Sequence, residues 1–430
     1  MNCCFENTLH YSSPGHGDWG VVRIGMLLPE SVQLFVCPSA CGRHGAIGAM
    51  RQGLKDRLFY LYVDQKDIVD GYDDLIPPAV EEVLAVLKKR PRAFYIFVSC
   101  LDDLLGTDHE ALREKLGKMH PDIHFLTGHM NPISLGSKTP PPVSIQNNLY
   151  CGLAWNGAKD ACVNSIGNLT AVARSSELYG FLEACGVPAL RHISQYSTYD
   201  GYLEMGKSRA NLVLGAAGRQ AAEQMEERIG TPCLFLPATY LPEEIEENYR
   251  KLGAFLGCQG EPDFDLAACR RQAEEAVKEA RTAVGALPIV IDATAVAQPF
   301  GLAKALLSWG FSVVRVECQE CPAFDKGHLA WLEEYHPEVE IFQTEHHRAV
   351  LFDRRLPESL ALGVEGAYLA GSRYVADLFN DEGNFGYDGI VRLMKILAAG
   401  AAAPTDLEAL IGPEALPRRY RPALLLICAY

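Results

Sequence analysis

Residues 32–45 read VQLFVCPSACGRHG, and this stretch indicates the fold that the chain is expected to adopt. A short apolar run rich in Val and Phe ends at two cysteines, Cys37 and Cys41, which flank a turn of small residues. Apolar runs of this length, closed by Pro and Gly, are typical of buried β-strands. In α/β sheets, ligands bind beyond the carboxyl ends of the strands, so we expect both cysteines at a binding edge.

A second stretch repeats this arrangement and adds a third cysteine. Residues 93–98 form another apolar run, which leads into Ser99 and Cys100 and then into LDDLLGTD at residues 101–108. Two strands are therefore expected to deliver cysteines to the same edge of one sheet. Thiolates presented in this way are the usual ligands of iron–sulfur clusters or of zinc. A free cysteine also behaves as a small buried hydrophobic residue, so each thiol taken singly has a purely structural alternative.

The composition is that of a large globular protein. The chain has 430 residues, which suggests two or three domains, and 48% hydrophobic residues are enough for several cores. The net charge of -15 argues against a general nucleic-acid binder, because phosphate binding needs an excess of Lys and Arg. No stretch approaches the ~18 apolar residues of a membrane span. The first residues lack the pattern of a signal peptide, so we expect a cytoplasmic protein. Its 14 cysteines are then expected to be metal ligands or buried thiols rather than a disulfide framework.

Apolar runs alternate with helical patterns along the chain, which predicts parallel sheets built from successive α/β units. We expect an N-terminal α/β domain with cluster-binding loops at residues 1–160, a middle α/β domain at 161–285, a third at 286–400 and a tail at 401–430. The proline-rich residues 137–142 are expected to form a stiff, extended boundary segment. The charged helix at residues 264–282 is expected to act as a connector.

Four stretches together resemble the nitrogenase component 1 superfamily over nearly the full length of the chain. They are residues 37–44, residues 100–108, residues 210–213 with 225–232, and residues 383–389. Cys41 falls at the ligand position of the family's glycine-rich cluster loop, and Cys100 opens a segment similar to the family's Cys, then Gly-Asp-Asp, pattern. The superfamily includes the catalytic subunits of nitrogenase, the dark-operative protochlorophyllide reductase and the reductive cyclase of a nickel-tetrapyrrole cofactor.

The resemblance implies three Rossmann-like domains, each a mostly parallel sheet flanked by helices, and a dimer of identical or related subunits. It implies an iron–sulfur cluster, of the 4Fe–4S type, at the subunit interface, with Cys41 and Cys100 as ligands and Cys37 as the expected third. A separate ATP-hydrolysing iron protein would supply electrons one at a time. We assign no phosphate-binding loop to this chain, so ATP is expected to bind that partner.

Two departures from the family pattern bear on the chemistry. The family's first cluster cysteine would fall in the loop that contains Ser13 and His16, where there is no cysteine. Ser13 or His16 could substitute, Cys37 could take over, or the partner subunit could supply the missing ligand. Gly215 stands where the nitrogenase catalytic subunit anchors its molybdenum–iron cofactor by a thiolate, and residues 376–386 contain no counterpart of the second anchor, a histidine. We therefore expect no molybdenum–iron cofactor, and a cavity for an organic substrate or a different cluster.

Other residues that could carry chemistry have structural alternatives. Cys318 and Cys321 form a Cys-x-x-Cys pair, but no second pair follows it to complete a zinc site. Asp108 and His109 are candidates for proton delivery, although Asp at a helix start also acts as a cap. Arg43 could meet an anionic substrate or pair with a carboxylate. Four histidines are more readily explained as surface or satisfied residues: His328, His336, His346 and His347.

Two classes of function remain. The first is a nitrogenase-like reductase subunit that passes electrons from the iron protein, through its iron–sulfur cluster, to a tetrapyrrole or other unsaturated substrate. The second is a non-catalytic scaffold on which a metallocluster or cofactor is assembled. A third reading, a small-molecule-binding protein that has lost the cluster, is distinguished from both by the absence of iron and acid-labile sulfide.

Overall fold

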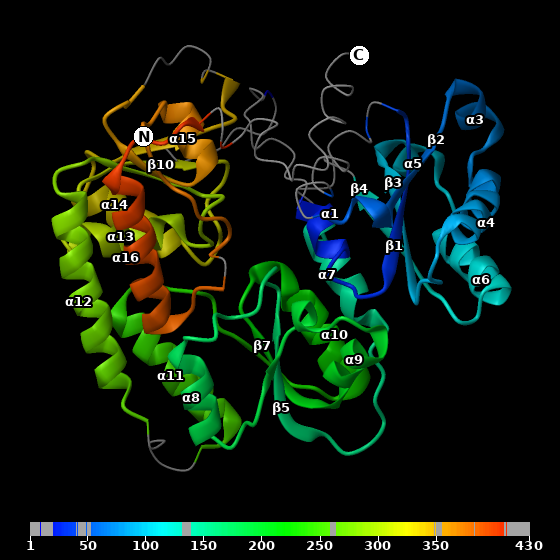
Figure 1. The fold of residues 1–430 in the computed structure, drawn as a ribbon, viewed down its shortest axis with the longest axis horizontal. Coiled ribbons are helices and arrows are strands. Elements are labelled where there is room, and N and C mark those ends of the chain that lie inside the picture. Colours follow the sequence, from blue (N-terminus) through cyan, green and yellow to red (C-terminus); the bar gives the residue numbers. More distant parts are fainter. Residues whose placement is uncertain are drawn as a thin grey trace. The chain divides into compact units, whose positions relative to one another are not determined.

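The computed structural model shows three parallel β-sheets flanked by helices, which confirms the expected α/β class (Figure 1). It describes residues 20–39, 53–130, 139–258, 264–347, 355–381 and 383–407, together with Leu9, Cys41, Ala49, Ala349 and Leu410. These residues form two compact units. The first two sheets belong to one unit, which consists of the described residues between Gly17 and Ala171 and of Leu190–Phe235. The third sheet belongs to a unit made by Val172–Ala189 and the described residues from Leu236 onward.

The first sheet has the strand order β2-β1-β3-β4, and all its strands are parallel. Its strands are β1 (Ser31–Cys37), β2 (Leu58–Tyr62), β3 (Ala93–Ser99) and β4 (His124–Met130). The central strands β1 and β3 are buried along their whole length, as expected for parallel strands that are covered on both faces. The chain adds β2 on one side of β1 and β3 on the other, so the switch point of this sheet lies between β1 and β3.

Helices cover both faces of the first sheet (Figure 1). They are α1 (Gly20–Gly25), α3 (Gln65–Asp70), α4 (Ile76–Val86), α5 (Cys100–Leu105), α6 (His109–Met119) and α7 (Pro141–Cys151). Successive residues of β1 point to opposite faces and so enter different cores. Leu34 packs in the core that contains residues of α4 and α6, whereas Cys37 packs in the core that contains residues of α1 and α7.

The middle sheet is also parallel and has the order β6-β5-β7-β8. Its strands are β5 (Asp160–Ile166), β6 (Leu190–Arg191), β7 (Ser208–Val213) and β8 (Cys233–Phe235). The helices α9 (Tyr199–Leu203) and α10 (Arg219–Ile229) lie in the same compact unit. Its switch point lies between β5 and β7, which repeats the arrangement of the first sheet.

The third sheet has the order β11-β10-β9-β12-β13 and belongs to the other compact unit. Its strands are β9 (Ile289–Asp292), β10 (Val313–Cys318), β11 (Glu340–Gln343), β12 (Leu360–Leu362) and β13 (Tyr374–Ala376). The helices of this unit are α8 (Glu177–Ala184), α11 (Pro242–Leu256), α12 (Leu266–Val284), α13 (Pro299–Ser308), α14 (Lys326–Tyr335), α15 (Val364–Ala370) and α16 (Gly386–Ala402).

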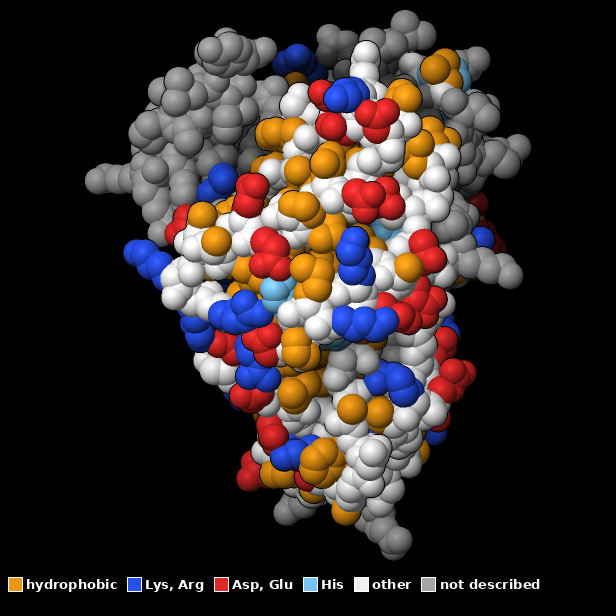
Figure 2. Space-filling model, turned by 90° about the vertical axis from the view of Figure 1, so that its right-hand side faces the viewer, with side chains coloured by type: hydrophobic (Ala, Val, Ile, Leu, Met, Phe, Trp, Pro, Cys, Tyr) orange, Lys and Arg blue, Asp and Glu red, His pale blue; other side chains and the backbone are white. Residues whose placement is uncertain are grey.

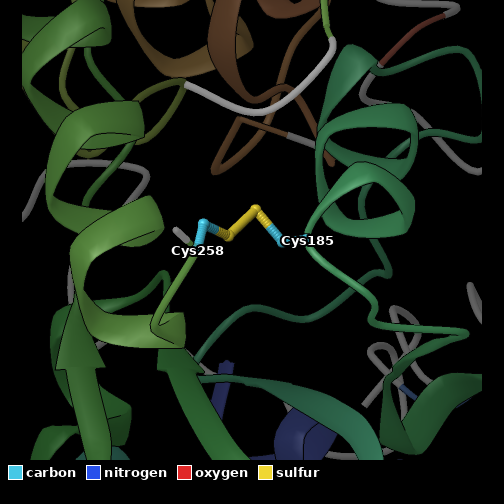
Figure 3. Close-up of a disulfide and its surroundings, with 2 residues drawn as sticks. All are labelled: Cys185 and Cys258. Atoms are coloured by element: carbon cyan, nitrogen blue, oxygen red, sulfur yellow. A yellow bond between two sulfur atoms is a disulfide. The ribbon is translucent and has the colours of Figure 1, made fainter. Parts of the chain in front are cut away.

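A disulfide joins two cysteines that the sequence predicts to be free thiols or metal ligands. Cys185 caps the end of α8, and Cys258 follows the end of α11 (Figure 3). The bridge spans 73 residues of sequence and ties the Val172–Ala189 segment to the rest of its unit. The expectation of free thiols is wrong for this pair, because spacing alone does not show that the two helix ends meet. Among the other cysteines that the structure describes there is no second disulfide.

Two local predictions are corrected by the structure. In the described part of the proline-rich segment, Pro140 is extended, but Pro141 and Pro142 form the first turn of α7, where a missing N–H costs no helical hydrogen bond. The supposed connector helix is α12, which packs along α16 and buries Ala273 and Val277 (Figure 1). Its charged residues lie on one face only, so a charged sequence here marks an amphipathic helix of the unit rather than a linker.

None of the helices in the described ranges has both the length and the apolar character needed to cross a membrane.

Candidate functional site

The candidate site lies at the switch point of the first sheet, where β1 and β3 end side by side. Val36 and Val98 are paired across these two strands. Cys37 follows Val36 as the last residue of β1, and Cys100 comes two residues after Val98 as the first residue of α5. The structure thus brings the two cysteines to one edge of the sheet, where α/β proteins bind their ligands.

Cys41 lies in the turn that leaves this edge. Its backbone N–H donates a hydrogen bond to the carbonyl oxygen of Pro38 at 2.9 Å, and its half-buried side chain packs against the core that contains Cys37. Burial, with a smaller contribution from the neighbouring Cys41, raises the pKa of Cys37 to about 12. Burial also raises the pKa of Cys41, and Cys100 adds to that rise. Each of these cysteines therefore lies within electrostatic reach of the next.

The chemistry of these three residues fits a thiolate-bound metal group. Three neighbouring thiolates repel one another, which is why each raises the pKa of the next; a bound metal cation removes that repulsion and keeps the thiolates deprotonated. Iron–sulfur clusters take up to four thiolate ligands, of which this edge offers three, and the burial of Cys37 provides the dry surroundings that lower a cluster's potential. Three further candidates lie outside the described residues: Ser13, His16 and Arg43.

A second polar group lies directly beside Cys100. Asp102 of α5 is buried, and its carboxylate accepts hydrogen bonds from the Tyr72 hydroxyl and from Nε2 of His109. Nδ1 of His129 lies 3.8 Å from the same carboxylate. Burial raises the pKa of Asp102, but the hydrogen bonds from His109 and Tyr72 outweigh it, so the pKa is lowered overall. The sequence indicated His109 but not Asp102 or His129, because only the strand register of the folded chain shows that His129 lies opposite Val98.

Asp108, the other candidate for proton delivery, is a helix cap. Its carboxylate accepts hydrogen bonds from the backbone N–H groups of Glu110 and Ala111, at 3.1 and 2.9 Å. These are the contacts of an N-cap residue, and they place Asp108 at the start of α6 as the sequence alternative expected. Its carboxylate is therefore occupied in holding the helix.

The candidates of the other unit include His328 and the pair Cys318 and Cys321. His328 lies between Asp325 and Glu244, with both nitrogen-to-oxygen distances at 2.8 Å, and these hydrogen bonds raise its pKa to about 9. A charged histidine held by two carboxylates is a fixed cross-link rather than an open metal ligand. Cys318 is buried at the end of β10 and Cys321 is half-buried, and in the described ranges no second Cys-x-x-Cys pair accompanies them.

Residues 201–208 read GYLEMGKS and match the spacing of a phosphate-binding loop. The expectation that the chain has no such sequence motif is therefore wrong. A working loop follows a strand and opens a helix, whose N–H groups meet the phosphates. This segment has the opposite order, because it begins within α9 and ends on the first residue of β7. Lys207 is paired with Glu204 at 2.7 Å, and Ser208 is a buried strand residue. The segment therefore lacks the geometry of a nucleotide site.

The switch point of the middle sheet is closed by backbone. A Cβ atom added to Gly215 would lie 2.3 Å from the carbonyl oxygen of Gly167, and one added to Gly167 would lie 2.2 Å from that of Gly215. A Cβ atom on Gly218 would lie 2.6 Å from Cα of Gly167. These distances are far below van der Waals contact, so residue 215 cannot carry a side chain unless the backbone moves.

Charged side chains of both signs are mixed with hydrophobic ones on the face shown in Figure 2. The net charge of -15 is therefore not gathered into one acidic area on this face. Among the described residues drawn there, Lys and Arg do not form a continuous basic surface of the kind that binds a nucleic-acid backbone.

Three parallel α/β sheets, with cysteines at the switch point of the first, define a Rossmann-like class of protein whose ligands bind at such switch points. The chain belongs to the nitrogenase component 1 type oxidoreductase family, which matches it over residues 18–401.

The fold is similar to that of nitrogenase Cp1. The solved structure at pH 6.5 has a TM-score of 0.71 over 92% of this chain and 94% of that chain, with 16% sequence identity. The structure at pH 5 has a TM-score of 0.58 over 88% and 87% of the two chains, with 15% identity. In sequence, the nitrogenase iron–molybdenum cofactor biosynthesis protein NifE of Clostridium pasteurianum is 22% identical over 198 residues, which cover 45% of this chain and 42% of that protein. The match to NifE thus spans less than half of either protein.

Proposed function

We propose that this chain is a subunit of a nitrogenase-like reductase and holds an iron–sulfur cluster of the 4Fe–4S type through Cys37, Cys41 and Cys100. The observation that carries the proposal is the meeting of these cysteines at the switch point of the first sheet, in a member of the nitrogenase component 1 family. Such a cluster supplies one-electron transfer at low potential when bound. The chain's own part is to present three thiolates from two strand ends and to bury one of them.

The proposed electron donor is a separate iron protein that hydrolyses ATP. Two observations support this assignment: the chain belongs to a family whose members work with such a partner, and its GYLEMGKS segment lacks a nucleotide-binding geometry. Docking is expected at the surface nearest Cys41 and Cys100, because electron transfer requires a short distance. A second copy of this chain or a related subunit, which could also contribute a cluster ligand, completes the proposed dimer. We place this assembly in the cytoplasm.

The proposed substrate is a tetrapyrrole or another unsaturated molecule, and not dinitrogen. The closed contact between Gly167 and Gly215 supports this, because a thiolate anchor for a molybdenum–iron cofactor has no room at residue 215. We also propose that the three sheets belong to three domains, with limits near residues 160, 285 and 400, followed by a C-terminal tail.

A second candidate function is a scaffold for assembly of a metallocluster or cofactor. The similarity to a protein named for iron–molybdenum cofactor biosynthesis favours it. The two candidates share the cluster site and differ in turnover. A scaffold releases its cargo to another protein, whereas a reductase subunit consumes electrons and reduces a substrate repeatedly.

The test begins with anaerobic purification and measurement of iron, acid-labile sulfide and the electron paramagnetic resonance spectrum. Iron and sulfide in equal amounts, with a cluster signal on reduction, support the proposal; a protein free of both contradicts it. Turnover of added tetrapyrroles with a matched iron protein and ATP then identifies a reductase. Transfer of a metallocluster to an acceptor protein without turnover identifies a scaffold.

A further inference from the structure

We infer that Asp102, His109 and His129 form a second metal site, distinct from the cysteine site, for a single divalent transition-metal ion such as Zn²⁺ or Fe²⁺. Each residue offers one ligand atom, and these atoms all lie within 4.8 Å of one another. Two imidazoles and one carboxylate are a recurrent ligand set of zinc and non-haem iron(II) sites that keep a coordination position open. The inference does not depend on the proposed cluster.

Three elements converge to build this site. Asp102 lies on the short helix α5, which ends at Gly106 in a left-handed conformation with φ 70°. That turn sends the chain back, so His109, the first residue of α6, meets Asp102 again. His129 comes from β4, whose register with β3 sets it opposite Val98, at the edge where α5 begins.

The ligand atoms lie near the spacing of a shared ion, and Nε2 of His109, which is hydrogen-bonded to Asp102, has to move away from that carboxylate when an ion enters. A hydrogen bond explains the contact between His109 and Asp102, but Nδ1 of His129 lies 3.8 Å from the same carboxylate, which is beyond hydrogen-bond length. Two ligands placed ~2.0–2.1 Å from a tetrahedral ion lie roughly 3.4 Å apart. The two imidazole rings meet edge to face, with centroids 5.0 Å apart, so both can turn a nitrogen toward one point.

The carboxylate of Asp102 is oriented by a hydrogen bond from Tyr72, which is not itself a ligand, as is usual at metal sites. The Tyr72 hydroxyl donates to Oδ1, which leaves Oδ2 directed at the two histidines. The Thr107 hydroxyl lies 3.4 Å from the Tyr72 oxygen. Partners of this kind fix the orientation of a ligand and tune its affinity for metal. The side chain of Asp102 is 3% exposed and that of His129 is 36% exposed, so the site is anchored on one side and open on the other.

The experiment uses the full-length protein, purified anaerobically and stripped of metal with a chelator, in the wild-type form and with Cys41→Ala and Cys100→Ala combined. The cysteine variant removes two of the three thiolates of the cluster site, so the Co²⁺ absorption spectrum then reports mainly nitrogen and oxygen ligands. We expect one Co²⁺ or Zn²⁺ ion per chain in that variant, with the visible bands of a site of low coordination number. Substitution of either histidine, His109→Asn or His129→Asn, should weaken binding more than about 10-fold.

Two further variants separate a metal site from a structural contact. Tyr72→Phe leaves all three ligands in place and should weaken binding about 10- to 100-fold through the loss of carboxylate orientation. His120→Asn removes a histidine of the same unit that is paired with Glu81 at 2.8 Å, and should leave binding unchanged. His129→Asn retains the contacts among Tyr72, Asp102 and His109, so its circular dichroism should match that of the wild type.

Three results would overturn the inference. They are the absence of stoichiometric binding to the folded protein, binding that neither histidine substitution weakens, and loss of the ion when only the two cysteines are replaced. The last result would assign the ion to the cysteine site. None of the three decides whether an iron–sulfur cluster binds, so the two proposals can fail separately.

Discussion

Replacement of Gly215 by Ala tests whether the middle switch point is closed by backbone contact. The backbone of Gly215 has φ -112° and ψ 134°, which any residue adopts, so the cost of Ala at this position is steric alone. The new Cβ atom would lie 2.3 Å from the Gly167 carbonyl oxygen, more than 1 Å closer than the 3.4–4 Å of ordinary contact. Because the atom it meets belongs to the backbone, a rotamer change cannot relieve the overlap. We expect a loss of about 1–3 kcal/mol in local stability.

Hydrogen exchange followed by mass spectrometry is the suitable assay, because it reports the opening of β5 and β7 separately from the other unit. A loss of 1–3 kcal/mol corresponds to ~5- to 150-fold faster exchange of their protected amides. Gly117→Ala is the matched control, since Gly117 lies inside α6 with nothing within 4 Å of its added Cβ atom. This control should stabilise its helix by about 0.5–1 kcal/mol. Exchange in β5 and β7 of Gly215→Ala equal to that of the wild type would refute the steric argument.

Four further predictions concern the other unit, the cofactor and electron entry. Removing the disulfide with Cys185→Ser and Cys258→Ser should lower the stability of its unit by about 2–4 kcal/mol, because it closes a 73-residue loop; a reductant should lower the melting temperature of the wild type and leave the double variant unaffected. Raising the pH through about 9 should remove the stability that charged His328 provides. Its pKa in the folded protein exceeds the unfolded value of about 6.5, so its contribution to the free energy of unfolding is complete below pH ~6.5 and lost above the folded pKa. We expect this contribution to be about 2 kcal/mol after screening by solvent. His328→Gln should abolish that pH dependence in urea unfolding, and an unchanged pH profile would disprove the role of this residue. Metal analysis should find no stoichiometric molybdenum or vanadium, whose presence would contradict the assignment at Gly215. Reduction of the cluster should require both the matched iron protein and ATP, since a low-potential cluster is not readily reduced by nicotinamide cofactors; full-rate turnover without ATP would refute this coupling.

Much of the fold could be predicted because its strands are buried on both faces. Continuous apolar runs, such as those of β1 and β3, are visible in sequence without knowledge of their neighbours. The predictions that failed concern residues whose role depends on distant partners. The prolines at residues 141–142 begin a helix because a tertiary surface receives α7 there. The disulfide depends on two helix ends that are 73 residues apart in sequence.

The candidate site also contains residues that could be predicted from the sequence and residues that could not. The cysteines could be found from the sequence because each follows directly on a strand, and parallel strands end at one edge. The metal-ligand group beside them could not, because it needs the register between β3 and β4 and the left-handed turn at Gly106. The GYLEMGKS segment shows the converse: its spacing suggests a nucleotide site, but it runs from the second half of α9 to the start of β7, which excludes that geometry.

The central claim is that Cys41 and Cys100 are ligands of an iron–sulfur cluster. Its most direct test is the iron and acid-labile sulfide content of anaerobically purified Cys41→Ala and Cys100→Ala proteins. Cys233→Ala is the control, because Cys233 is a half-buried free thiol of the middle sheet. We predict that both site variants lose the iron, sulfide and cluster signal of the wild type while the control retains them. Iron and sulfide at the wild-type level in both site variants would contradict the claim.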